Sequence, residues 1–163
     1  PDGSRSRRNA VRCSIMSESR VIPATDSGWA GVDARRYKDG AGPFRDVVRH
    51  KLLGGMSREP DLAFEVRYFE VAPGGYSSLE RHEHPHAVVV VKGRGTVRLG
   101  DRVAEIRPLD VIYVAPHEVH RFEAHDSEPL GFLCVVDRVR DRPILVDQGQ
   151  EGEGSQPPMP EAP

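Results

Sequence analysis

The chain has 163 residues, of which 37% are hydrophobic and 29% are charged, and its formal net charge is −2. This length fits one domain, and the charge balance excludes the basic face that nucleic-acid binding requires. No apolar run approaches the roughly 20 residues of a membrane-spanning helix. We therefore expect neither a nucleic-acid nor a membrane partner. The two cysteines, Cys13 and Cys134, are too few for a disulfide framework, which indicates a cytoplasmic protein.

The two ends of the chain lack the patterns of folded elements. Residues 1–15 carry four arginines and no apolar core of a secretory signal, and Met16 with its following Ser-Glu-Ser resembles a natural start. We expect residues 1–15 to be a non-native, disordered leader. Residues 148–163 are mostly Gly, Glu, Gln and Pro, which predicts a disordered tail. Residues 16–45 are expected to form an N-terminal arm anchored by Trp29 and Phe44.

Residues 46–147 contain short apolar runs separated by turn residues. Pro73-Gly74-Gly75 predicts a turn, Gly100-Asp101 predicts a tight hairpin, and no segment has the 3.6-residue period of a helix. This regular spacing predicts an all-β barrel or sandwich. The predicted strands are Arg45–Leu53, Leu62–Val71, Ser78–His84, His86–Lys92, Thr96–Leu99, Val103–Ile106, Val111–Val114, His120–Ala124 and Leu130–Asp137.

Four of the seven histidines gather around two of these strands: His82, His84, His86 and His120. Alternate residues of a strand point to one face, so the first three can share an interior that His120 reaches from a neighbouring strand. Because Cα atoms four residues apart on a straight strand are about 13 Å apart, we expect a kink, which Pro85 can supply. The pattern predicts one divalent metal ion held by four imidazoles. The remaining histidines are expected at the surface or rim: His50, His117 and His125.

The spacing of these residues resembles the two metal motifs of the cupin superfamily. The matching residues are Gly75, His82, His84, Gly93, Pro108, Pro116 and His120. His86 stands where that family has a glutamate. The resemblance implies a single-domain cupin, a double-stranded β-helix or jelly-roll barrel with a metal ion inside it.

Three further stretches resemble a group of small single-domain cupins that includes the cupin-type 1-methylthio-xylulose 5-phosphate methylsulfurylases. They are Arg67–Gly75, Leu79–His82 and Gly131–Asp137. This resemblance implies a manganese centre, with iron, nickel or zinc as alternatives. It also implies removal of a methylthio group from a ketose phosphate by a thiol such as glutathione. Cys134 is then the candidate catalytic thiol, and its alternative role is that of a small buried hydrophobic residue.

A phosphorylated substrate requires cationic or hydroxyl donors near the cavity, and we expect Arg67, Tyr68 and Arg81 to bind it. A cupin dioxygenase, a cupin isomerase and a non-catalytic cupin that binds a metal or small molecule are alternatives. We also expect a homodimer, because the edge strands of an isolated barrel have to be covered.

Overall fold

The structure, a computed structural model, describes residues 19–38, 42–54 and 62–147. All regular structure in these ranges is β-strand, and no helix among them is long and apolar enough to cross a membrane. The predicted leader, residues 1–15, and the predicted tail, residues 148–163, lie outside the described residues. The fold class is all-β, as the spacing of turn residues predicted.

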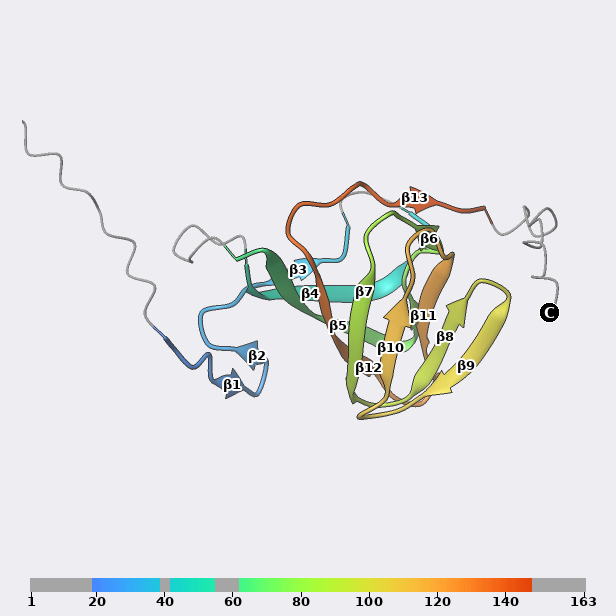
Figure 1. Cartoon of the computed structure of the whole chain (residues 1–163). Helices are drawn as coiled ribbons and strands as arrows, with labels where there is room; N and C mark the ends of the chain where they lie inside the picture. Colours follow the sequence, from blue (N-terminus) through green and yellow to red (C-terminus); the bar gives the residue numbers. More distant parts are fainter. Residues whose placement is uncertain (1–18, 39–41, 55–61, 148–163) are drawn as a thin grey trace, which may run out of the picture.

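The strands make a two-stranded sheet and a larger antiparallel sheet of eleven strands, which curls into a barrel (Figure 1). Strands β1 and β2 form the small sheet beside the barrel, and the order β10-β7-β12-β5-β11 runs through the large one. In chain order the strands are β1 (Ala24–Thr25), β2 (Gly28–Trp29), β3 (Ala34–Arg36), β4 (Arg45–Leu53), β5 (Phe64–Tyr76), β6 (Glu80–Arg81), β7 (His86–Lys92), β8 (Gly95–Leu99), β9 (Arg102–Ile106), β10 (Val111–Val114), β11 (His120–Ala124), β12 (Leu130–Asp137) and β13 (Ile144–Leu145).

Alternation along the strands separates the core from the outer surface. In β7, Val88 and Val90 are fully buried whereas Val91 is exposed. In β12, the sequence left open which face is interior, and the structure buries Cys134 together with its alternate neighbours on the strand. The core side of each strand therefore faces the same interior into which the histidines of β7 and β11 also project.

The predicted turn at Pro73-Gly74-Gly75 is wrong, because β5 continues through it to Tyr76. Gly74 has a φ of 66°, in the region that glycine adopts most easily, and its N–H donates to the carbonyl of His125 at 3.0 Å. The chain therefore bends within the strand instead of reversing. Tyr76 pairs with both Arg45 of β4 and Glu123 of β11.

The N-terminal arm packs on the outer face of β4 and β5. The Trp29 ring lies 4.8 Å from Tyr68 and 5.6 Å from His50, measured between centroids. A Cβ at Gly28 would lie 3.0 Å from Cε1 of His50, so glycine lets the arm approach closely. His50 is only 5% exposed, and the expectation of a surface position was wrong because the arm covers it. Phe44 packs on Tyr37 instead.

Candidate metal centre

His82 and His84, the first two of the four histidines predicted to bind a metal ion, lie on a loop and not on a strand. Strand β6 ends at Arg81 and β7 begins at His86, so the predicted strand Ser78–His84 is mostly wrong. The carboxylate of Asp141 accepts hydrogen bonds from the backbone N–H groups of Glu83 at 2.9 Å and His84 at 3.2 Å. These bonds replace a strand ladder, and the chain bends where a kink was expected.

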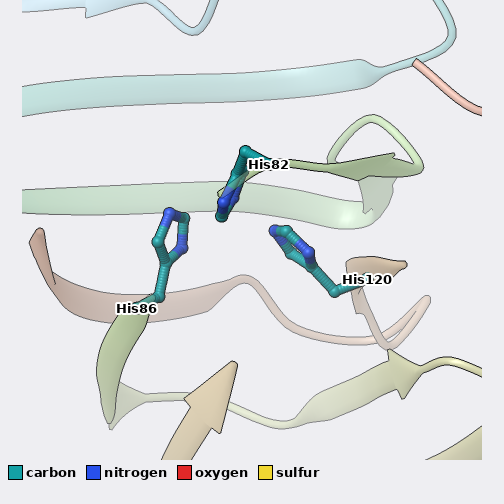
Figure 2. Close-up of side chains that lie close together, drawn as sticks. All are labelled: His82, His86 and His120. Carbon is teal, nitrogen blue, oxygen red and sulfur yellow. The ribbon is translucent and has the colours of Figure 1, made fainter. Parts of the chain in front are cut away.

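The bend brings three imidazoles together from three elements. His82 comes from the loop after β6, His86 from the start of β7 and His120 from the start of β11, and Figure 2 shows the three rings turned toward one another. One ligand nitrogen from each lies within 4.8 Å of the others. The ring centroids of His82 and His86 are 4.4 Å apart, much closer than a straight strand would allow. This trio is the strongest candidate for a metal site among the described residues.

Hydrogen bonds to backbone carbonyls orient two imidazoles of this trio, those of His82 and His120. His82 Nδ1 donates to the carbonyl of His84 at 2.7 Å, and His120 Nδ1 donates to the carbonyl of Glu118 at 3.0 Å. Since a carbonyl can only accept, the proton of each ring is at Nδ1 and the lone pair is at Nε2. His82 Nε2 is buried and has no hydrogen-bond partner among the described residues. Such an atom is costly unless something binds it, so these residues fit a metal ion.

His84 lies beside this trio. Its ring stacks on that of His82 with a centroid distance of 3.8 Å, and its Nδ1 donates to Asp141 Oδ1 at 2.6 Å. A carboxylate behind the imidazole is the usual arrangement for a metal-binding histidine. However, His84 is not in the group whose ligand nitrogens lie within 4.8 Å of one another. Its role as a fourth ligand stays a prediction.

Burial keeps the imidazole rings of the trio, His82, His86 and His120, uncharged at neutral pH. Desolvation, together with the neighbouring imidazoles of His120 and His84, lowers the pKa of His82 to about 4. Desolvation also lowers the pKa values of His86 and His120 below the ordinary range for imidazole. The neutral ring is the form that binds a metal ion. Because this trio contains no carboxylate, a bound dication would keep its full charge and could act as a Lewis acid.

Cys134 faces the same interior. Its Sγ lies 3.6 Å from His86 Nδ1, and its Cα is the direct cross-strand partner of Arg67. Burial raises the pKa of the Cys134 thiol to about 12, although the charge of Arg67 lowers it in part. The protein groups alone therefore keep the sulfur protonated at neutral pH. A nearby dication would act in the opposite direction.

The candidate ligands line a cavity of about 180 Å³ that also contains Cys134 and Arg67. Of the three residues expected to bind substrate, only Arg67 lines it. Tyr68 lies on the outer face of β5, where its hydroxyl donates to Glu70 at 2.9 Å. Arg81 is exposed and does not line the cavity. Alternation along the strand explains Tyr68, because its neighbour Arg67 takes the inward position.

The sequence reasoning missed two polar groups of the cavity wall. Glu80 is buried and accepts hydrogen bonds from Tyr37 and Lys38 of the arm and from Ser78. The second group contains Arg140, which binds the buried carboxylate of Glu65 at 3.0 Å. Both groups join residues more than 40 positions apart, and no local pattern in the sequence marks them.

Comparison with known proteins places the chain in a family. A family model described as Cupin domain matches residues 67–136. The 1-methylthio-D-xylulose 5-phosphate methylsulfurylase of Rhodospirillum rubrum is 46% identical over 118 residues, which are 72% of this chain and 73% of that protein. A crystal structure of a cupin-2 domain from Rhodospirillum rubrum shares 41% identity and a TM-score of 0.68, covering 79% of this chain and 84% of that one. A cupin 2 barrel protein from Rhodopseudomonas palustris shares 41% identity and a TM-score of 0.72, with coverages of 79% and 88%. This chain therefore belongs to the cupin family.

Proposed function

We propose that this cupin is a metal-dependent enzyme that removes a methylthio group from a ketose phosphate with the help of a thiol. The observation that carries the proposal is the contact between the metal trio and a thiol: Cys134 Sγ lies 3.6 Å from His86 Nδ1 inside one cavity. The methylsulfurylase of Rhodospirillum rubrum, at 46% identity, supports this reaction over the other cupin reactions.

His82, His86 and His120 would hold the metal ion, with His84 as a fourth ligand. Imidazole ligands suit manganese, iron, nickel and zinc, and we propose manganese because the sequence resembles that of manganese cupins. When bound, the ion would supply Lewis acidity to polarise the ketone of the substrate. The protein's own part is to present neutral imidazoles whose Nδ1 atoms are held by the carbonyls of His84 and Glu118.

The reaction balances with a thiol as the second substrate. The thiol sulfur attacks the methylthio sulfur, an S–S bond forms and the bond between C1 and sulfur breaks. The electron pair of that bond remains on C1, which takes up the proton that the thiol gave up. The products are 1-deoxyxylulose 5-phosphate and a methyl disulfide. If Cys134 is the attacking thiol, glutathione regenerates it by thiol–disulfide exchange and carries the methylthio group away.

The volume of the cavity and the charged groups in its wall suit a small, polar substrate. Its volume of about 180 Å³ is near that of a cavity known to take benzene, about 150 Å³, and a pentose derivative can extend through the mouth. Glu80 and Lys38 form an ion pair in the cavity wall, which also contains Arg67. Polar groups of both signs can therefore contact hydroxyl and phosphate oxygens.

The decisive experiment is an assay of the purified protein loaded with Mn²⁺. We expect 1-deoxyxylulose 5-phosphate to form from 1-methylthio-xylulose 5-phosphate only when both metal and glutathione are present, detected by mass spectrometry. His82→Ala is expected to lose turnover, while His117→Asn, a change outside the trio, retains it. Absence of turnover by the fully metal-loaded protein would contradict the proposal. Consumption of O2 during turnover would indicate a dioxygenase instead.

A further inference from the structure

A surplus of positive charge surrounds one buried carboxylate on β5, that of Glu65. Glu65 is 4% exposed and lies on β5, two residues from Arg67 on the same inward face. Its oxygens accept hydrogen bonds from Arg67 Nε at 2.8 Å, Arg140 Nη2 at 3.0 Å and Lys51 Nζ at 3.1 Å. Three cations therefore share one anion, and the group is left with two positive charges.

Two of these cations face the cavity. Arg67 and Arg140 line it, whereas Lys51 contacts Glu65 from β4 without lining it. The charges elsewhere in the wall cancel, because Glu80 pairs with Lys38. The side chain of Arg67 is only 11% exposed, so water screens its charge poorly. Unpaired buried charge is costly, and an anion in the cavity would offset that cost.

Arg67 has the geometry to bind such an anion. Its Nε and Nη2 are held by Glu65, while its Nη1 donates to no acceptor among the described residues. Arg140 is different, because its Nη1 donates to the carbonyls of Asp137 and Arg138. Arg140 therefore contributes mainly charge, and Arg67 contributes both charge and free N–H groups. Guanidinium groups held in this way bind phosphate oxygens well.

We propose that the Arg67 end of the cavity is the binding site for the phosphate monoester of the substrate, with Glu65 as the positioning residue. A phosphate dianion matches the two surplus charges of the group. This inference rests on the proposed function for the identity of the substrate as a ketose phosphate. It adds that discrimination between phosphorylated and free ketose arises at Arg67, and not at Tyr68 or Arg81.

Binding of stable probes to the Mn²⁺-loaded full-length protein tests the site. Isothermal titration calorimetry would compare D-xylulose 5-phosphate, D-xylulose and inorganic phosphate. We expect the phosphorylated sugar to bind the unaltered protein at least tenfold more tightly than the free sugar. In Arg67→Gln, this ratio is expected to fall close to one while the affinity for D-xylulose stays unchanged. Arg81→Gln, which removes an exposed arginine outside the cavity, is the matched control and should keep the full ratio.

Several results would overturn the proposed phosphate site at Arg67. Equal affinity of the unaltered protein for the two sugars would do so, and so would an Arg67→Gln protein that keeps the full ratio. If that variant fails to fold or to retain its metal, Arg67→Lys replaces it. Lysine keeps the charge but loses the planar pair of donors, so the ratio should drop several-fold, and an unchanged ratio would overturn the site. None of these measurements uses a methylthio group or a thiol. Failure of the methylsulfurylase assay would thus be distinguishable from failure of this site.

Discussion

Asp141 Oδ1 accepts a hydrogen bond from His84 Nδ1 at 2.6 Å. The same carboxylate also accepts the backbone N–H groups of Glu83 and His84. The hydrogen bond from His84 is the largest of the effects that hold the pKa of Asp141 below its ordinary range, so the group is ionised at neutral pH. One half-buried carboxylate from the segment after β12 therefore orients an imidazole and fixes the loop that carries His82.

Replacing this carboxylate should weaken metal binding without removing a ligand. We expect Asp141→Asn to raise the dissociation constant for Mn²⁺ roughly tenfold, the lower end of the usual effect of such supporting groups. Competition with a fluorescent chelator would measure it. Asp101→Asn, at the exposed hairpin between β8 and β9, is the control. An equal loss in both variants would mean that general charge, and not orientation of His84, is responsible.

The histidine variants should fall into three classes when metal content is measured by elemental analysis. His82→Ala, His86→Ala and His120→Ala each remove a member of the trio and should lose most of the bound metal. His84→Ala should lose less, because its ring lies outside that trio. His117→Asn should lose none, and asparagine tolerates the φ of 64° at that position. Full metal content in His120→Ala would contradict the proposed centre.

Cys134→Ser tests the thiol separately from the metal. The change is nearly isosteric, so we expect the melting temperature and metal content to stay close to those of the unaltered protein. Turnover with glutathione should drop at least roughly tenfold, a loss of about 1.4 kcal/mol of transition-state stabilisation. Full activity of this variant would show that external glutathione attacks the substrate directly.

Acid should destabilise the metal-free protein. Burial lowers the pKa of His82 to about 4 and also lowers those of His86 and His120, whereas an unfolded imidazole has a pKa of about 6.5. Between these pH values the imidazoles bind protons in the unfolded chain but not in the folded chain. The free energy of unfolding therefore decreases as the pH drops from about 6.5 toward 4. Urea unfolding midpoints across this range would show the slope. His86→Gln should flatten the slope, because it removes one of the imidazoles whose pKa burial lowers.

We expect the predicted homodimer to form through the outward face of β10, β7 and β12. It exposes Val111 by 74% and Tyr113 by 64%, and Val91 and Val135 by 43% and 37%. The outward positions between them on these strands carry no charged side chain: Ala87, Val89 and Leu133. An uncharged apolar face can pair with a second copy of itself across a two-fold axis without repulsion.

Light scattering is expected to give a dimer mass for the unaltered protein and a monomer mass for Tyr113→Glu. Val103→Glu, which adds the same charge to exposed β9, should remain dimeric, and a monomeric unaltered protein would refute the interface.

Local chemistry determined much of this protein. Apolar alternation and turn residues predicted β4, β7, β10, β11 and β12 with the bounds that the structure has, because these signals depend on neighbouring residues only. The three histidines of the metal trio could be recognised as candidate ligands for the same reason, since short stretches of sequence contain them at a characteristic spacing. The restrictions of proline also predicted a kink near Pro85, and the chain bends at the two preceding residues, Glu83 and His84.

The tertiary structure decided what depends on residues far apart in the chain. The inward orientation of Cys134 follows from the pairing of β12 with β5 and β7, since alternation alone is compatible with either face. Asp141 supports His84 across 57 positions, and Glu65 holds Arg140 across 75. Neither contact leaves a local pattern, because an acidic residue in a polar segment looks the same whether it faces solvent or a buried partner. The charge of the cavity is a property of this packing, and only the folded chain defines it.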